Sequence, residues 1–233
     1  MPVITIACSK GGVGKSTIAT SLVVSLTQAG FKVALLDSDP QFSASLWADT
    51  RLDDESLPQI KHVQKIGKIK HEAVALSKQY DYVVVDTGGH DSTEMRQSLV
   101  VADLAIIPMR QSQYDLDVIE GMTEIIDDAQ SIGNDKLKTV YILNMVNPNS
   151  KSKKAEELIE ALSDDENIDL YSGCLYSRDA YVESSSTGRG ITELKDRKGK
   201  AEFVAFTDYI INLFKGKKNG RSKKTKQKEK AKA

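Results

Sequence analysis

The feature that most constrains the fold lies at the start of the chain, where residues 9–17 read Ser-Lys-Gly-Gly-Val-Gly-Lys-Ser-Thr. An apolar, β-prone run over residues 3–8 leads directly into this glycine-rich turn. Glycines let backbone N–H groups approach a phosphate closely, and the positive end of a following helix dipole favours the anion. The sequence therefore predicts a strand, a phosphate-binding loop and a helix in immediate succession.

The details of the loop are more specific than its class. The common pattern G-x-x-x-x-G-K-[ST] is not met, because Ser9 stands at the first glycine position. The loop fits instead a deviating form, K-G-G-x-x-K-[ST], with an additional Lys10 five residues before Lys15. Lys15 is expected to reach the β- and γ-phosphates, and the Ser16 hydroxyl is expected to bind Mg²⁺. The residues expected around the phosphates are Lys10, Gly11, Gly12, Val13, Gly14, Lys15, Ser16 and Thr17.

Short apolar runs alternate with helical patterns along most of the chain, which predicts an α/β fold. The expected strands are residues 3–8, 32–37, 82–86, 104–108, 139–144 and 169–175. The expected helices are residues 15–29, 42–47, 69–79, 92–101, 116–131, 153–162 and 202–214. Several strands are continuously apolar, as in strands covered on both faces. We expect a doubly wound, mostly parallel sheet with helices on both faces and ligands at the carboxyl ends of the strands.

Charge divides the chain into two parts. Residues 215–233 contain ten Lys/Arg and one Glu, so this tail carries +9 and the preceding 214 residues carry −10. We expect one phosphate-loop (P-loop) domain over residues 1–214 and a disordered, basic tail over 215–233. Residues 184–200, rich in Ser, Gly, Lys and Arg, are expected to form a mobile loop. Lysine runs of this kind bind phosphate backbones without reading sequence, although a simple solubility tail and binding to RNA or another anionic surface are alternatives.

Composition excludes other classes. No apolar stretch approaches the roughly 20 residues of a membrane helix, and the first apolar run lacks the basic flank of a signal peptide. The cytoplasm is therefore the expected compartment. Cys8 and Cys174 are expected to be free thiols, because disulfides are rare there.

Two carboxylates follow the second expected strand in the segment Leu-Leu-Asp-Ser-Asp-Pro-Gln, residues 35–41. Asp37 and Asp39, two residues apart, point the same way from the sheet. Beside a nucleotide they can bind Mg²⁺ through water or orient an attacking water. A simple turn is the alternative, since Asp and Pro are common turn residues.

A third set of residues follows the strand expected over 82–86. Asp86 ends four apolar residues, which is the form of a Walker B strand, and is expected to contact the Mg²⁺ shell. Gly88 and Gly89 can bring backbone N–H groups to the γ-phosphate and let the loop move on hydrolysis. His90 is a weak candidate for a base, because a lone histidine beside a glycine turn is usually structural or solvated.

These segments, together with residues 102–109 and 176–181, resemble the deviant Walker A ATPases of the ParA/MinD group, in particular the small ParA-type partition ATPases. The resemblance implies an ATP/ADP- and Mg²⁺-dependent ATPase that forms a homodimer around ATP. In such a dimer Lys10 would reach the partner's nucleotide. Lys10, Lys15 and Asp39 would be catalytic, and Ser16, Asp39 and Asp86 would organise Mg²⁺. Asp37 would support the loop or the metal shell, and Asn144 would contact adenine.

The resemblance also implies partners: non-specific DNA and a ParB-like centromere-binding protein, in a cytoplasmic, nucleoid-associated setting. No DNA-reading helix-turn-helix domain is expected before Met1. The candidate DNA contacts are Arg178, Arg189, Lys195, Arg197, Lys217, Lys218, Arg221, Lys223 and Lys224. One departure concerns the segment after Asp86, which reads Thr-Gly-Gly-His where many partition ATPases have a proline-containing turn.

Several alternative functions stay open from the sequence. Positioning of another cargo would use the same chemistry, and a MinD-like protein would use an amphipathic terminal helix, here residues 202–214, to bind membranes. Core packing is the favoured interpretation of that helix, so membrane binding is not expected. An ATP-dependent ligase and a non-hydrolysing nucleotide-binding scaffold are further alternatives. An iron–sulfur reductase is disfavoured, because Cys8 and Cys174 lie in the wrong elements to share a cluster.

Overall fold

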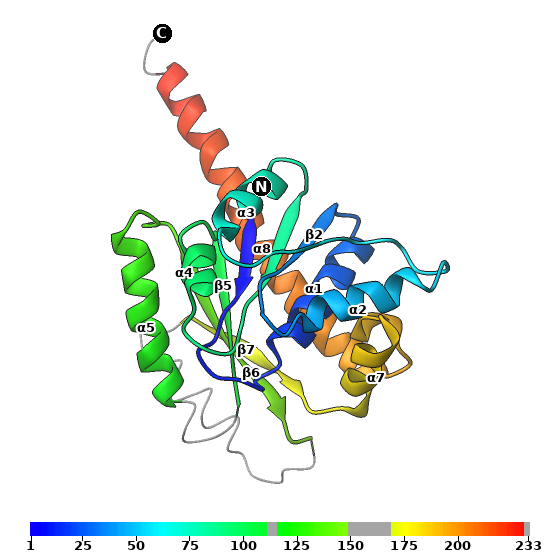
Figure 1. The fold of residues 1–233 in the computed structure, drawn as a ribbon. Helices are drawn as coiled ribbons and strands as arrows, with labels where there is room; N and C mark the ends of the chain where they lie inside the picture. Colours follow the sequence, from blue (N-terminus) through cyan, green and yellow to red (C-terminus); the bar gives the residue numbers. More distant parts are fainter. Residues whose placement is uncertain (111–115, 149–168, 231–233) are drawn as a thin grey trace.

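A computed structural model describes residues 1–110, 116–148 and 169–230, without the side chains of 116–117 and 216–230. The described strands form one sheet of seven in the order β3-β2-β4-β1-β5-β6-β7 (Figure 1). Every neighbouring pair is parallel. The strands are β1 (Val3–Ile6), β2 (Val33–Asp37), β3 (Lys61–Gln64), β4 (Tyr82–Asp86), β5 (Leu104–Met109), β6 (Lys138–Val146) and β7 (Leu170–Tyr176). The expected doubly wound α/β fold is confirmed.

Helices cover both faces of the sheet, as Figure 1 shows. The described helices are α1 (Lys15–Gln28), α2 (Ser43–Leu52), α3 (Ile69–Ser77), α4 (Thr93–Leu99), α5 (Leu116–Ser131), α7 (Asp179–Thr187) and α8 (Arg197–Lys230). One hydrophobic core joins α3, α4 and α5 to one face, and a second joins α1, α2 and α8 to the other. The central strands are therefore buried on both sides, which is why they are continuously apolar.

Register brings the polar strand ends together. Asp86 pairs with Ile6 on one side and with Asp37 on the other, so two carboxylates stand side by side at one edge of the sheet. Strand β1 ends between β4 and β5, and the phosphate loop follows it at the centre of that edge. From β1 the chain continues first to strands on one side of the sheet and later to strands on the other side. Such a topological switch point is the usual ligand site of an open parallel sheet.

Two elements were not expected from the sequence. The strand β3 has the sequence Lys-His-Val-Gln and lies at the edge of the sheet beside β2. It is half-exposed and largely polar, so it has neither the alternation nor the apolar run that identifies a strand. Helix α7 is short and contains four consecutive Ser/Thr residues, which are weak helix formers. The helix expected over 153–162 lies outside the described residues.

The expectation of a mobile loop over residues 184–200 was wrong. Helix α7 ends at Gly188, whose φ of +64° suits glycine and whose missing Cβ leaves room for the backbone of Arg51. The 3₁₀ turn η2 (Ile191–Glu193) follows, and Gly190 packs against Val24 of α1. The polar composition of this segment concealed a packed turn, because its contacts come from residues more than 100 positions away.

A buried ion pair fixes this turn to α2. Both terminal nitrogens of Arg51 donate to the Glu193 carboxylate at 2.8 and 2.9 Å, and Arg51 also donates to the carbonyl oxygens of Pro58 and Gly188. The Arg51 guanidinium lies 5.6 Å from the centre of the Trp47 ring. All these polar groups are satisfied, so the pair can be buried without an orphaned charge.

Helix α8 begins earlier and ends later than expected. Phe203, Phe206 and Ile210 are fully buried against the sheet, which confirms core packing as the role of its apolar stripe. The helical backbone continues to Lys230, through the segment expected to be without structure. Its Lys, Arg, Gln and Glu residues favour helix, whereas Gly216 and Gly220 disfavour it. Figure 1 shows its last turns extending beyond the sheet and the other helices. The division of the chain near residue 214 stays a prediction. Among the described helices, none is long and apolar enough to cross a membrane.

Candidate nucleotide-binding site

The loop between β1 and α1 has the geometry of a phosphate-binding loop. Gly14 immediately precedes α1 with φ +89°, a conformation that L side chains rarely adopt. A Cβ at this position would lie 2.4 Å from the Asn144 amide nitrogen. Glycine is therefore required at Gly14 both by its backbone and by its neighbour.

Side chains from three places secure the carbonyl oxygens of this loop. Lys15 Nζ donates to Lys10 O at 3.0 Å, and Asn144 Nδ2 donates to Val13 O at 2.8 Å. The Arg110 guanidinium, at the end of β5, donates to Gly12 O. Asn144 thus supports the loop, and its expected contact with adenine stays a prediction. Arg110 was missed, because an arginine after an apolar strand carries no signal without the fold.

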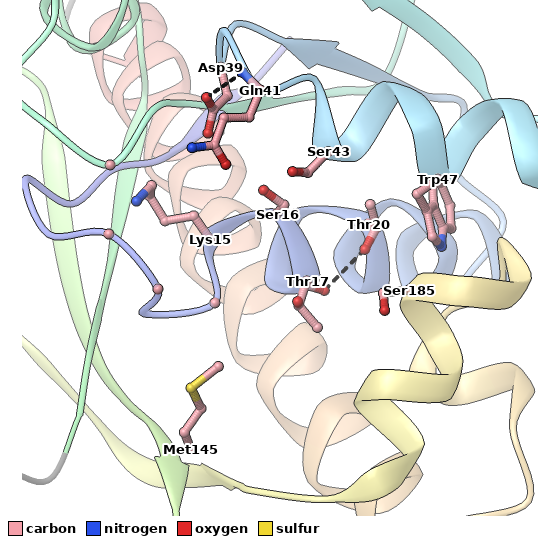
Figure 2. Close-up of a pocket in the computed structure, with 14 residues that line it drawn as sticks. Lys15, Ser16, Thr17, Thr20, Asp39, Gln41, Ser43, Trp47, Met145 and Ser185 are labelled. Atoms are coloured by element: carbon pink, nitrogen blue, oxygen red, sulfur yellow. Dashed lines mark hydrogen bonds between the residues drawn. The ribbon is translucent and has the colours of Figure 1, made fainter.

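Lys15 lines a pocket of about 420 Å³ (Figure 2). Its side chain is buried, and this burial lowers the pKa of the ammonium below its ordinary value, opposed by the charges of Cys8, Asp86 and Asp39. The pocket is lined by Gly11, Gly12, Gly14, Lys15, Ser16, Thr17, Thr20, Asp39, Gln41, Ser43, Trp47, Gly89, Met145 and Ser185. Most of the phosphate-site residues expected from the sequence therefore meet in one place.

Asp37 and Asp39 are brought to this edge by β2 but have different surroundings. Asp37 is buried and accepts hydrogen bonds from the backbone N–H groups of Ser45 at 2.7 Å and Asp39 at 3.1 Å. Burial raises its pKa, and these bonds oppose the shift. Asp39 lines the pocket and accepts from the N–H of Gln41 at 2.9 Å (Figure 2). Asp37 thus stabilises the segment that follows β2, and Asp39 is the carboxylate that lines the pocket.

Asp86 has the least satisfied side chain of the site. It is completely buried, and within the described part of the chain neither carboxylate oxygen has a hydrogen-bond partner. Burial raises the pKa of Asp86 to about 8, the nearby Ser16 hydroxyl opposes this shift, and the charges of Asp37 and Asp39 reinforce it. An orphaned carboxylate beside a hydroxyl is an oxygen donor set that fits a hard cation such as Mg²⁺. Ser16 and Asp86 therefore fit the metal expected there, and Ser16 and Asp39 both line the pocket.

The segment after Asp86 approaches the phosphate loop closely. A Cβ at Gly89 would lie 2.8 Å from Gly11 Cα and 3.4 Å from Lys15 Nζ, so this glycine allows the two loops to touch. Gly89 lines the pocket, whereas Gly88, expected at the nucleotide, is buried and outside the lining. His90 is exposed and also outside the lining.

A second hollow of about 220 Å³ shares Thr17, Met145 and Ser185 with the first. Asn144 and Tyr181 also line it, and the Tyr181 hydroxyl is buried without a partner in the described structure. Burial raises the pKa of Tyr181 well above its usual range, so this group stays a neutral donor. The two hollows together offer a charged end for phosphates and a less polar end for the rest of a nucleotide.

The candidate DNA contacts have unequal surroundings. Arg178 is paired with Glu202 and lies 3.7 Å from Asp196, and Arg189 is paired with Asp54. Lys195 and Arg197 are exposed at the start of α8. The side chains of Lys217, Lys218, Arg221, Lys223 and Lys224 lie outside the described structure. Both ion-paired arginines are thereby less available to a phosphate backbone than the sequence alone suggested.

Comparison with known proteins agrees with this geometry. Residues 4–191 match the family described as the CobQ/CobB/MinD/ParA nucleotide binding domain. The chain belongs to this family. It is 28% identical over 203 residues to the protein ParA of Rhizobium radiobacter, which covers 85% of this chain and 89% of that protein. It is 32% identical over 155 residues to the maintenance of carboxysome distribution protein A of Halothiobacillus neapolitanus, which covers 64% of this chain and 69% of that protein. The resemblance to ParA-type ATPases is confirmed.

Solved structures share the fold at low sequence identity. An ATP complex of a variant Cyanothece McdA has a TM-score of 0.74 at 18% identity, covering 91% of this chain and 96% of that one. MinD of Pyrococcus horikoshii, complexed with Mg-ADP, has a TM-score of 0.70 at 17% identity, covering 91% and 96%. Nucleotide and magnesium are thus found in neighbours of this fold.

Proposed function

We propose that this family member is an ATP-dependent DNA partition ATPase that dimerises around ATP, binds DNA without sequence preference and is stimulated by a ParB-like centromere-binding partner. The observation that carries the proposal is that Lys15 and Asp39 line one pocket, while the buried, orphaned Asp86 lies close enough to interact electrostatically with both. The match to ParA over 85% of the chain supports the partition role.

Each residue has a chemical task in this proposal. Lys15 and the loop N–H groups bind the phosphates, and Ser16 and Asp86 hold Mg²⁺. The metal, when bound, neutralises charge on the β- and γ-phosphates. Asp39 orients the attacking water, because it is the carboxylate that lines the pocket. Lys10 crosses to the nucleotide of the partner subunit, so its charge contributes only in the dimer.

DNA binding would be electrostatic. Lys195 and Arg197, with the neighbouring Lys198 and Lys200, form an exposed basic segment between η2 and the body of α8. The tail adds ten Lys/Arg residues after Phe214. Contacts of this kind neutralise backbone phosphates and do not read bases.

The test is binding of the full chain to a random-sequence duplex with Mg²⁺ and either ATP or ADP. Tight binding with ATP alone is the expected result. Equal binding with both nucleotides would make the tail a constant tether and contradict nucleotide switching. Failure to bind with either nucleotide would remove DNA from the proposal. Phosphate release, measured with and without DNA, tests the hydrolysis separately.

A second candidate function is the positioning of a different cargo. The 32% identity to a carboxysome distribution protein favours it specifically. The chemistry of nucleotide and DNA would be the same, so only the partner distinguishes the two. Recovery of a centromere-binding protein on the immobilised ATP-bound chain supports partition, and recovery of a protein-shell component supports positioning.

A MinD-like membrane cycle has less support. The apolar stripe that could insert into a membrane, Phe203, Phe206 and Ile210, is packed against the sheet and would have to leave the core. Co-sedimentation with anionic vesicles is expected to depend on the basic tail alone. Salt at 0.5 M shortens the Debye screening length roughly threefold relative to low salt and so weakens electrostatic binding. Co-sedimentation that persists in 0.5 M salt after removal of the tail would contradict this expectation.

A further inference from the structure

We propose that Arg110 is a positioning residue of the phosphate loop, which turns the Val13 N–H toward the β-phosphate of the bound nucleotide. The proposal rests on the nucleotide site described above and deepens it. Neither the motif of the loop nor the expected catalytic set contains this arginine.

Arg110 lies beside the phosphate loop. It directly follows β5, which pairs with β1 on one side and with β6 on the other. The backbone N–H of Ala7, at the start of the loop, donates to Ile106 O at 3.0 Å, so the end of β5 and the loop are joined by the sheet. Arg110 therefore has a fixed base beside the loop, while its side chain is exposed.

The side chain of Arg110 contacts the loop at Gly12. The Arg110 guanidinium donates to the Gly12 carbonyl oxygen, and a Cβ on Gly12 would lie only 3.4 Å from the same nitrogen. Within the described residues, no carboxylate forms an ion pair with Arg110. Arg110 therefore acts on the loop through its hydrogen bond to the Gly12 carbonyl oxygen.

The peptide between Gly12 and Val13 links the direction of the Gly12 carbonyl to that of the Val13 N–H. This peptide is trans, so its C=O and N–H point in opposite directions. Gly12 and Gly14 line the pocket, and Arg110 lies outside that lining. By holding the Gly12 carbonyl on its own side, outside the pocket lining, Arg110 leaves the Val13 N–H directed to the opposite side of this peptide. The Asn144 amide acts on the next peptide in the same way, through Val13 O.

The consequence is a preorganised anion site. A peptide that already points its N–H at the phosphate does not have to rotate when the nucleotide binds. Because the β-phosphate is present in both ADP and ATP, both nucleotides should benefit alike. This separates Arg110 from Lys10, which is expected to act only in the ATP-bound dimer.

The experiment compares Arg110→Gln with the unaltered chain by calorimetric titration of Mg²⁺-ADP and of a non-hydrolysable Mg²⁺-ATP analogue. Loss of a charge-assisted hydrogen bond should weaken both nucleotides by about tenfold. Arg110→Lys retains a charged donor and should restore most of the affinity. Arg96→Gln is the matched control, because it removes the same charge from an exposed arginine side chain outside the pocket lining and outside the proposed DNA-binding segment. In the ligand-free chain, Arg110→Gln should also shift the backbone amide resonance of Val13.

Three results would overturn the inference. They are affinities of Arg110→Gln within twofold of the unaltered chain, a loss confined to the ATP analogue, and an equal loss in Arg96→Gln. If the unaltered chain binds neither nucleotide, the proposed function fails together with this inference. Normal nucleotide binding by both the unaltered chain and Arg110→Gln overturns only the role of Arg110.

Discussion

Single residues at the phosphate loop combine tasks that are usually described separately. Asn144 supports the loop through Val13 O and also lines the second hollow, and Gly89 lets the segment after Asp86 touch the loop. Such double use makes each residue sensitive to a small change in shape. The glycines of the phosphate loop can be compared in the same way, because a methyl group would meet different neighbours at each of them.

The two glycines at the ends of the loop should respond differently to alanine. Gly14→Ala places a methyl group 2.4 Å from the Asn144 amide at φ +89°, whereas a methyl group on Gly11 would meet nothing within 4 Å. We expect Gly14→Ala to lower the free energy of unfolding by about 2 kcal/mol or more, and Gly11→Ala to change it by less than about 0.5 kcal/mol. Urea unfolding of the ligand-free chain measures both, and equal effects would contradict the geometry.

Asp39 should be separable from nucleotide binding. Asp39→Ala removes the pocket-facing carboxylate without disturbing Asp37, which anchors the start of α2. We expect hydrolysis to fall at least about a hundredfold while ATP affinity is retained, because positioning of a water acts on the chemical step. Single-turnover phosphate release is the measurement, and the exposed Asp49→Ala is the control. Faster turnover in Asp39→Ala would contradict the assigned role.

At the scale of elements, α2 links the carboxylate loop to the turn before α8. The helix begins beside Asp37 and ends at the Arg51–Glu193 pair, and Trp47 between them lines the pocket and donates its indole N–H to Arg189 O. Both side chains of the pair are at least nine-tenths buried. Buried pairs of this kind respond strongly to loss of one partner.

The Arg51–Glu193 pair should make a large contribution that an exposed pair does not match. Glu193→Gln leaves a buried guanidinium without its counter-charge, and we expect the free energy of unfolding to fall by about 3 kcal/mol. Arg96→Gln, at the exposed pairs with Asp91 and Asp128, should cost about 0–1 kcal/mol. Chemical unfolding of both variants checks the contrast, which similar losses would refute.

The same pair predicts a dependence on pH. Burial alone would raise the pKa of Glu193, but Arg51 and the Gly190 N–H hold it below its ordinary value of 4.5. A lowered pKa means that the unfolded chain binds the proton first, so the contribution is complete above pH 4.5 and is lost as the pH falls through the folded value. Below pH 4.5 the stability of Glu193→Gln should therefore decline less steeply than that of the unaltered chain. Parallel profiles would contradict the pairing.

At the scale of the whole molecule, an acidic body of −10 carries a basic tail of +9. The core contacts of α8 are made up to Phe214, and Lys215 is already exposed. Removal of the residues after Phe214 should therefore leave the unfolding temperature unchanged to within about 2 °C.

The tail and the basic segment at the start of α8 should differ in their effect on DNA binding. Truncation after Phe214 removes many phosphate contacts, so the slope of log affinity against log salt should become shallower by several units, at about 0.9 per contact. Neutralising Lys195, Arg197, Lys198 and Lys200 should instead abolish the difference between ATP and ADP. Filter binding across a salt series measures both quantities. An unchanged slope after truncation would show that the tail does not contact DNA.

The sequence by itself determined the order of most strands and helices, the phosphate loop and the pocket-facing residues Lys15, Ser16 and Asp39, because these depend on local spacing and on continuous apolar runs. It also predicted the buried role of the α8 stripe, since one apolar face at helical spacing is a local pattern. Only the tertiary structure showed that Asp37 is satisfied by backbone N–H groups and that both carboxylate oxygens of Asp86 are orphaned among the described residues. It alone revealed β3, the packed turn at Gly188 and the contact of Arg110 with Gly12. These features arise from contacts between residues far apart in the chain, and no local pattern encodes them.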